Sequence, residues 1–315
     1  MAPRMTETES SAPSPATRCG VVAVLGAPNA GKSTLVNALV GQKVAITSAK
    51  AQTTRARMLG IALHELDGAP TQMILVDTPG IFAPRRRLDR AMVSAAWEGA
   101  EAADAVLLMV DPIKQRRHEL EPLLETLAAR PERKILVLNK VDRAKKEPLL
   151  VLAQELTGKV DFSEVFFISA LTGEGVPELK DNLAKLMPEG EWMYPEDQVS
   201  DASERLLAAE ITREQLYQQL HEELPYDSAV RPEKYEVRPD GSVEIHQQIV
   251  VTRDNQRAIV LGKGGSKIKA IGAAARAELM EVLGVKVHLY LHVKVLENWA
   301  EDKEVFEEIG LDWVR

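Results

Sequence analysis

A glycine-rich octapeptide, Gly26–Ser33 (GAPNAGKS), fits the pattern GxxxxGK[ST]. Glycines let backbone N–H groups turn inward around phosphates, at a helix N-terminus that favours negative charge. The sequence predicts that Lys32 reaches the β- and γ-phosphates and that the Ser33 hydroxyl binds Mg²⁺. The residues expected around the phosphates are Gly26, Ala27, Pro28, Asn29, Ala30, Gly31, Lys32, Ser33 and Thr34.

Two later segments are expected to complete the site around the metal and the γ-phosphate. Asp77 closes an apolar run, where its carboxylate suits the surroundings of Mg²⁺, and Gly80 lets its N–H approach the γ-phosphate. In the polar loop 48–55, Thr54 is the predicted Mg²⁺ ligand and Thr53 the alternative. The residues assigned to this side of the nucleotide are Thr54, Asp77, Thr78, Pro79 and Gly80, and those assigned to catalysis are Lys32, Thr54 and Gly80.

A third motif, Asn139-Lys140-Val141-Asp142, predicts which base is bound. One carboxylate can accept from both N1 and N2 of guanine, whereas adenine would leave it unpaired, so Asp142 favours GTP over ATP. Asn139 is expected to tie the base to the phosphate loop, and Lys140 to lie along the base. Ser169 and Ala170 are expected to place a backbone N–H near guanine O6.

One absence bears on the reaction rate. Many small GTPases carry Gln immediately after their D-x-x-G motif, where it orients the attacking water. Ile81 occupies that position here. We therefore expect slow intrinsic hydrolysis that a partner or an ordered water network accelerates.

Alternating strand and helix patterns indicate the scaffold that positions these motifs. Short apolar runs precede each motif, and helical patterns separate the later ones, which predicts an α/β fold with a mostly parallel, doubly wound sheet. The expected strands are 21–25, 58–66, 73–76, 105–110, 135–138 and 165–168, and the expected helices start at 33 and span 90–101, 118–129, 147–156 and 176–186.

The pattern changes after a segment rich in Pro and Gly at 188–199, which is typical of a linker. The α+β unit that follows contains the loop Gly262-Lys263-Gly264-Gly265 between two helices. A GxxG loop of this kind lets a single-stranded nucleic-acid backbone approach in KH domains, and nearby lysines supply charge. The residues expected to contact RNA are Gly262, Lys263, Gly264, Gly265, Lys267 and Lys269. The elements expected are helices 201–224 and 266–283 and strands 235–237, 243–251 and 285–296.

Composition excludes several classes of protein. The 315 residues carry a net charge of −8, 45% are hydrophobic, and Cys19 is the only cysteine. A mostly disordered chain, a disulfide scaffold and a membrane-spanning protein are therefore not expected. We expect a reducing, cytoplasmic location. Residues 1–18, rich in Ser, Thr, Pro and Ala, predict a disordered tail.

The net charge of −8 is unfavourable for binding nucleic acid, but it is an average over the whole chain, and the charges are unevenly distributed. Between Arg253 and Arg276, six basic residues stand against one acidic residue, whereas from Glu297 to Asp312 seven acidic residues stand against one lysine. The local charge around the GxxG loop therefore suits RNA. We interpret the acidic C-terminal segment as a solvated helix that aids solubility.

Together the motifs GAPNAGKS, QTTR, DTPG, NKVD, SA and LGKGGSKIKAIG resemble Era, the bacterial family of Ras-like GTPases with a C-terminal KH domain. The resemblance implies a GTPase domain at 19–188, a linker at 189–200 and a type II KH domain at 201–315, with GTP, GDP and Mg²⁺ as ligands. It also implies binding to the 3′ end of 16S rRNA, a role in maturing the 30S subunit, and peripheral contact with the inner face of the cell membrane. No DNA partner is expected.

Two other functions fit parts of the sequence. An RNA-binding assembly chaperone could use the nucleotide as a structural ligand rather than as a timer. A tRNA-modifying GTPase of the same superfamily would need a catalytic C-terminal cysteine, which this chain lacks.

Overall fold

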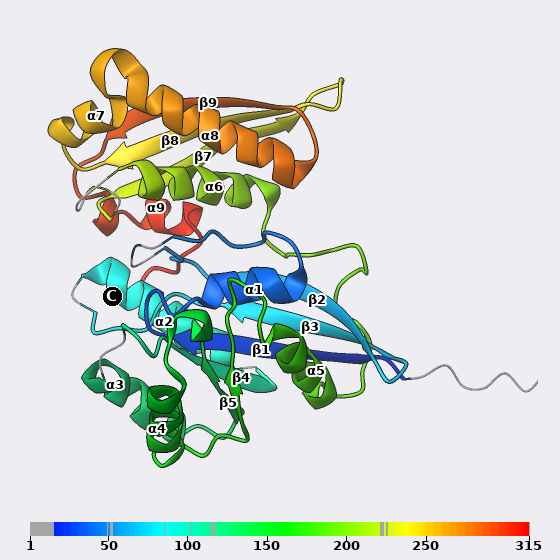
Figure 1. Cartoon of the computed structure of the whole chain (residues 1–315). Helices are drawn as coiled ribbons and strands as arrows, with labels where there is room; N and C mark the ends of the chain where they lie inside the picture. The colour runs from blue at the N-terminus through cyan, green and yellow to red at the C-terminus, as the bar shows by residue number, and fades with distance from the viewer. Residues whose placement is uncertain are drawn as a thin grey trace, which may run out of the picture.

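The computed structural model describes residues 16–48, 50, 53–84, 86–101, 103–114, 117–220, 224 and 226–314. Within these residues a six-stranded sheet forms the first unit and a three-stranded sheet the second. Figure 1 shows the two units stacked, with the first below and the second above. The predicted N-terminal tail lies outside the described residues up to residue 15.

The six-stranded sheet has the order β2-β3-β1-β4-β5-β6. Five strands are parallel, and β2 pairs antiparallel with β3. The predicted mostly parallel α/β fold is therefore confirmed. The β2–β3 hairpin was not predicted; its Asp67-Gly68 turn has φ values of 52° and 77°. The strands are β1 (Arg18–Gly26), β2 (Met58–Leu66), β3 (Ala69–Asp77), β4 (Ala105–Val110), β5 (Arg133–Leu138) and β6 (Glu164–Phe167).

Helices cover both faces of this sheet, as a doubly wound fold requires. On one face, α1 and α5 bury Leu35, Leu39 and Leu183 against the strands. On the other face, α3 and α4 bury Leu127 and Leu152. The helices are α1 (Lys32–Val40), α2 (Arg87–Glu101), α3 (Arg117–Ala128), α4 (Lys146–Thr157) and α5 (Val176–Leu186), with a short 3₁₀ turn η1 at Val141–Arg143.

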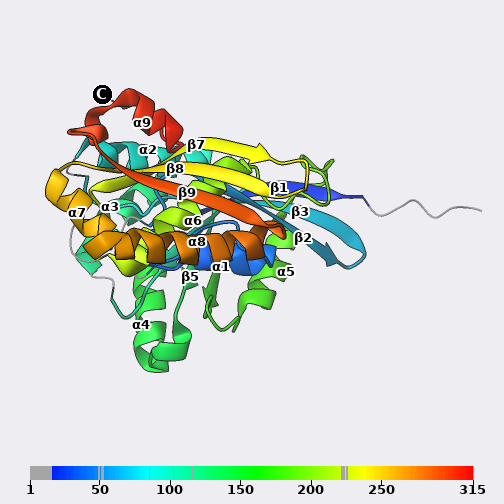
Figure 2. The same cartoon turned by 90° about the horizontal axis from the view of Figure 1, so that it is seen from above.

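The second unit has the element order α-β-β-α-α-β expected of the KH domain. In its sheet β8 pairs antiparallel with β7 and parallel with β9, and the three strands lie side by side in Figures 1 and 2. Helices α6 and α8 pack on one face, where Leu216, Ile249 and Ile271 are buried together. The elements are α6 (Glu204–Gln219), β7 (Ser228–Val237), β8 (Val243–Val251), α7 (Asp254–Leu261), η2 (Lys263–Gly265), α8 (Ser266–Leu283) and β9 (Val287–Val295).

In the second unit, the predicted bounds of one helix and one strand were wrong by three residues or more. The helix expected at 201–224 is shorter, because the Ser203 side chain caps its start by accepting from the Leu206 amide and Leu220 has left the helical conformation. Strand β7 begins at Ser228, seven residues before the expected start. Pro232 interrupts its alternation, and the ladder shifts register between Pro232 and Lys234, which hid the strand in the sequence.

The ends of the first unit are tied together. Strand β1 begins at Arg18, which the sequence analysis had assigned to the tail. The Thr17 hydroxyl donates to Gly190 O at 2.8 Å, so ordered structure reaches back before Cys19. The segment expected to be a linker also lies on the sheet, since the Ile61 amide donates to Val199 O at 2.8 Å and Ser200 forms an isolated bridge with Gly60.

The acidic C-terminal segment is not a freely solvated helix, so that interpretation was wrong. Its elements η3 (Trp299–Glu301) and α9 (Lys303–Glu308) bury Trp299 and Phe306 against Leu88 and Met92 of α2. The Nε atom of Arg87 pairs with Glu301 at 2.8 Å across the same contact. Figure 1 shows α9 between the two units. Counting charges hid its apolar face, and the segment joins the two units.

Candidate functional site

The predicted phosphate loop connects β1 to α1, so its amide groups gather at a helix N-terminus. Its backbone adopts positive φ values at Gly26, Asn29 and Gly31. A Cβ atom at Gly31 would lie 2.2 Å from Asn139 Nδ2, so a side chain is excluded there. The loop is thus shaped both by its own glycines and by Asn139 of the third motif, which packs against it.

Lys32 is buried at the first position of α1. Its Nζ atom donates to the carbonyl oxygens of Gly26 at 3.2 Å and Ala27 at 3.1 Å. Burial lowers the pKa of Lys32 from 10.5 to about 8, although the Asp77 carboxylate opposes that change. The ammonium group therefore lies inside the loop that the sequence assigned to the β- and γ-phosphates, where an anion would restore its charge balance.

Three oxygen-bearing side chains from three segments converge beside this loop. Ser33 Oγ donates to Asp77 Oδ2 at 2.7 Å and shares a hydrogen bond of 2.8 Å with Thr54 Oγ1. Thr54 Oγ1 also lies 3.3 Å from Asp77 Oδ2. In contrast, Thr53 Oγ1 donates to Lys50 O at 2.8 Å, away from the cluster. Of the two threonines that the sequence left open, the structure brings Thr54 to the cluster.

The chemistry of this cluster fits a hard divalent cation. Burial raises the pKa of Asp77 from 3.8 to about 6, although the hydrogen bond from Ser33 and the charge of Lys32 oppose that rise. Among the described residues, Asp77 Oδ1 is buried without a hydrogen-bond partner. Two hydroxyls and a carboxylate with an unsatisfied oxygen are the ligand types that Mg²⁺ prefers.

Gly80 lies against the phosphate loop. A Cβ atom there would lie 2.6 Å from the backbone nitrogen of Pro28, so no side chain fits. Thr78 anchors the same turn through a 2.7 Å bond from its hydroxyl to Val24 O. The Ile81 side chain packs against the apolar cluster under α3 and α4, on the opposite side of the sheet from α1. An open pocket lies between the phosphate loop, the start of α1 and the loop that carries Thr54. Its lining residues are Pro28, Asn29, Gly31, Lys32, Ser33, Thr34, Ile46, Thr47, Ser48, Thr53, Thr54 and Gly80.

The predicted base-binding motifs also meet at the phosphate loop. Asn139 Nδ2 donates to Ala30 O at 2.8 Å, which is the phosphate-loop side of the predicted tie between loop and base. The Ala170 amide donates to Asn139 Oδ1 at 2.9 Å, so in this structure it bonds within the protein rather than facing the base. Ser169 is buried, and Asp142 lies exposed in η1.

Sequence reasoning missed one residue of this group, Asp111, at the end of β4. Lys140 Nζ donates to Asp111 Oδ2 at 2.7 Å and to Asn29 O at 2.8 Å. Burial alone would raise the pKa of Asp111, but Lys140 and the amides of Ile113 and Lys114 lower it overall. Its position directly after an apolar strand, like that of Asp77, was the signal that could have identified it.

The GxxG loop lies between α7 and α8 in the second unit. Gly262, Gly264 and Gly265 have φ values of 69°, 59° and 76°, a region that favours glycine. Space is open around the Cα atoms of Gly264 and Gly265. Lys263 and Lys269 are exposed there, whereas Lys267 is partly buried and its Nζ lies 3.4 Å from Gln219 O on α6. The loop thus offers a bare backbone with two solvent-facing cations.

Comparisons with known proteins agree over almost the whole chain. A family model described as 50S ribosome-binding GTPase matches residues 21–140, and one described as KH domain matches residues 223–300. GTPase Era of Erythrobacter litoralis is 84% identical over 298 residues, covering 95% of this chain and 98% of that protein. GTPase Era of Rhizobium meliloti is 54% identical over 308 residues, covering 98% of this chain and 97% of that protein.

Two solved structures share the arrangement of both units. One is a variant of Aquifex aeolicus Era bound to GDP·AlF4⁻, and the other is Era in complex with MgGDPNP and nucleotides 1506–1542 of 16S ribosomal RNA. Each is 38% identical to this chain, with a TM-score of 0.87, and each match covers 93% of this chain and 99% of the solved chain.

Proposed function

The chain belongs to the Era family of GTPases, and on that premise we propose that it is a GTP-driven switch that binds the 3′ end of 16S rRNA through its KH domain. As a member it hydrolyses GTP to GDP and phosphate with Mg²⁺ as cofactor. Its role would be in maturation of the small (30S) ribosomal subunit. The main support for the proposal is that one chain contains both a cluster of side-chain oxygens suited to Mg²⁺, at Ser33, Thr54 and Asp77, and a GxxG loop with basic residues beside it.

Within this proposal each part of the nucleotide has its own residues. Gly26–Thr34 and Asp77–Gly80 surround the phosphates, and Asn139, Lys140, Asp142, Ser169 and Ala170 surround guanine. Ser33, Thr54 and Asp77 would hold Mg²⁺, which supplies charge neutralisation for the phosphates when bound. Lys32 and the Gly80 amide would stabilise the negative charge that develops on the γ-phosphate oxygens.

Water activation is the least equipped step in this chain. Ile81 replaces the residue that commonly orients the attacking water, and its partly buried side chain packs against the apolar cluster under α3 and α4. We therefore expect slow intrinsic turnover. Single-turnover hydrolysis by the purified protein at about 1 s⁻¹ or faster, the range of kinases, would contradict that expectation.

The RNA part of the proposal is supported by the relative that was solved with 16S rRNA and by the local charge. Arg253 and Arg257 on and beside α7 are exposed together with Lys263 and Lys269, so cations line both sides of the loop. Ile259 is 54% exposed on the same helix and offers an apolar surface to a base. In this assignment the GTPase unit begins with β1 at Arg18, one residue before the predicted 19–188, the connecting segment covers 189–200 and the KH unit 201–315.

RNA binding can be tested with the full chain and a labelled oligonucleotide of the 16S rRNA 3′ end. Replacing Lys263 or Lys269 with Ala should weaken binding and reduce the slope of log affinity against log salt by about 1 for each lysine. Lys294→Ala is the matched control, since Lys294 is exposed on β9 between Val293 and Val295, the residues of this strand that pack with α7 and α8. Equal binding of a scrambled oligonucleotide would refute the ribosomal assignment.

The alternative, a chaperone with a structural nucleotide, predicts a different result in the same assay. A switch binds RNA with different affinities in the presence of GDP and of a non-hydrolysable GTP analogue, because each nucleotide stabilises a different conformation. A structural ligand would leave RNA affinity the same with both nucleotides and in the Thr54→Ala variant.

We also propose a cytoplasmic location, with peripheral contact to the inner face of the membrane. Family membership supports the membrane contact, and the unpaired, buried Cys19 fits a reducing compartment. Among the described residues, no helix has the length and apolarity needed to cross a bilayer. Flotation of the protein with vesicles of anionic lipids tests the contact, and its absence at low salt would refute that part.

A further inference from the structure

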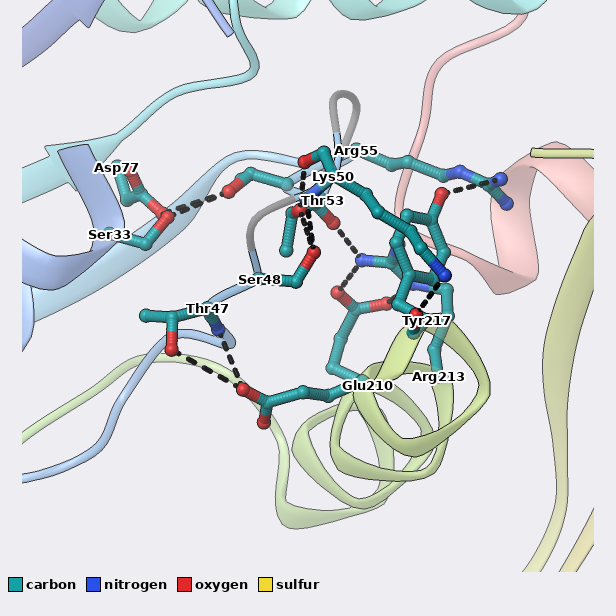
Figure 3. Close-up of polar contacts among 12 residues, drawn as sticks. Ser33, Thr47, Ser48, Lys50, Thr53, Arg55, Asp77, Glu210, Arg213 and Tyr217 are labelled. Atoms are coloured by element: carbon teal, nitrogen blue, oxygen red, sulfur yellow. Dashed lines mark hydrogen bonds and ion pairs between the residues drawn. The ribbon is translucent and has the colours of Figure 1, made fainter. Parts of the chain in front are cut away.

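The segment Lys43–Arg55, which carries Thr54, lies against helix α6 of the KH unit. We call its described residues, 43–48, 50 and 53–55, the switch segment. The Thr47 amide donates to Glu214 Oε1 at 3.0 Å. Lys50 Nζ contacts the carbonyl oxygens of Tyr217, in the last turn of α6, and of Leu220, directly after the helix. Figure 3 shows Thr47, Lys50 and Thr53 facing this helix. The segment that presents Thr54 is therefore held by the other unit.

Arg213 makes the contact nearest to Thr54 on one side. Its side chain is 3% exposed, and its Nη2 atom donates to the carbonyl oxygen of Thr53. Glu210 fixes the guanidinium from behind, accepting from Arg213 Nε at 2.8 Å. Burial alone would lower the pKa of Arg213, but Glu210 raises it above its ordinary value, so the donor is permanently charged. Charge-assisted bonds of this kind are roughly twice as strong as neutral ones.

Arg55 makes the corresponding contact on the other side of Thr54. Its guanidinium is buried among KH residues and donates to Ser228 O at 2.7 Å and to Tyr226 O at 3.1 Å. It also donates to the Tyr217 hydroxyl at 3.2 Å. Thr53 and Arg55 are thus both fixed by the KH unit, and the residue between them reaches Ser33 and Asp77.

From this geometry we propose that Arg213 is a positioning residue for GTP hydrolysis, which acts from the KH unit by holding Thr53 so that Thr54 faces the metal site. The proposal rests on Thr54 being a Mg²⁺ ligand, as the proposed function assigns. Holding the backbone in advance reduces the conformational entropy that ligand binding must overcome. Because coupling is reciprocal, Mg²⁺ and GTP must in turn strengthen the contact between the units.

A second inter-unit contact provides a matched control. Lys43 pairs with both Glu214 and Glu278 at the beginning of the switch segment. Glu278 belongs to α8, so Glu278→Gln weakens the attachment between the units without touching Thr53, Thr54 or Arg55. A general loosening of the two units would affect both variants alike, whereas positioning of Thr54 is specific to Arg213.

The test uses the full chain with the double variant Glu210→Gln/Arg213→Gln, which avoids leaving a buried charge unpaired. We expect its single-turnover hydrolysis rate to fall at least tenfold and the Mg²⁺ concentration for half-maximal rate to rise several-fold. GDP affinity in EDTA should stay within about twofold. Hydrogen exchange at the amides of residues 53–57 should accelerate in the metal-free protein. Glu278→Gln should leave the rate and the exchange within about twofold of wild type.

Arg213→Lys keeps the positive charge beside Glu210 and should restore part of the rate and of the Mg²⁺ dependence. It also carries the test if the double variant does not fold. The proposal is overturned if the double variant folds and has the hydrolysis rate, Mg²⁺ dependence and hydrogen exchange of wild type. If the double variant does not fold, the same three wild-type results for Arg213→Lys overturn it. Thr54→Ala separates the two claims. If Thr54→Ala leaves Mg²⁺ dependence unchanged, the ligand assignment itself is wrong; if only Thr54→Ala impairs it, Arg213 is not a positioning residue.

Discussion

Replacing Asp77 with Asn should stabilise the metal-free protein while it abolishes the metal site. The carboxylate is fully buried, and desolvation raises its pKa from 3.8 to about 6. An acid whose pKa is raised in the folded state contributes stability below its unfolded pKa, and this is lost as pH rises through the folded pKa. At about 1.4 kcal/mol per pKa unit, the folded state is penalised by about 3 kcal/mol at pH 8 and by about half as much at pH 5.

Asparagine removes the charge at every pH but adds a buried N–H₂ group. At the position of Asp77 Oδ2 that group would face the Ser33 and Thr54 hydroxyls in place of a carboxylate oxygen, which costs about 1 kcal/mol. The variant should therefore be more stable than wild type by about 2 kcal/mol at pH 8 and by less than about 1 kcal/mol at pH 5. Urea unfolding followed by circular dichroism, in EDTA and without nucleotide, measures both differences.

Adding Mg²⁺ and a GTP analogue should reverse the order of the two proteins, because a ligand that binds only the folded state stabilises it. Asp161→Asn, at an exposed carboxylate, is the control and should change stability by less than about 0.5 kcal/mol. The reasoning fails if Asp77→Asn is no more stable than wild type at pH 8, or if the gap is the same at pH 5.

Three further changes test other parts of the molecule. Asp142→Asn replaces an acceptor with a donor opposite guanine N2, so GTP affinity should fall about a hundredfold or more and xanthosine triphosphate should bind better, as measured by competition. Gly80→Ala would place a Cβ atom 2.6 Å from Pro28 N; single-turnover hydrolysis should be lost, and a wild-type rate would contradict the close approach. Phe306→Ala empties a fully buried position between the units and should cost about 3–5 kcal/mol in urea unfolding, with faster hydrogen exchange in α9.

Local patterns were enough to predict the scaffold of the nucleotide site. The predicted bounds of strand β4 and helix α5 equal those in the structure. A buried strand is recognisable as a short apolar run and an amphipathic helix by its apolar periodicity, and both patterns are contained in consecutive residues. The phosphate loop, Asp77 and Asn139 follow strands whose carboxyl ends meet at one edge of the sheet. Their convergence therefore follows from the predicted topology.

Features that depend on a distant partner were not readable in the same way. The sequence predicted Thr54 as the Mg²⁺ ligand and kept Thr53 as the alternative, because adjacent residues of a loop have no periodicity to say which side chain faces inward. Asp111 belongs to the base-binding group because it accepts a hydrogen bond from Lys140, and this contact exists only in the folded chain. The acidic C-terminal segment appeared solvated by its charge, and only packing on α2 revealed its apolar face.

The sequence by itself determined the chemistry of this protein, through the residue types and spacing of its phosphate, guanine and GxxG motifs. Only the tertiary structure decided how the two units act on each other. The bond from Arg213 to Thr53 joins residues 160 positions apart, and the bond from Arg55 to Tyr217 joins residues 162 apart. A buried arginine looks like any other in the sequence, because its burial is created by the surfaces that close around it.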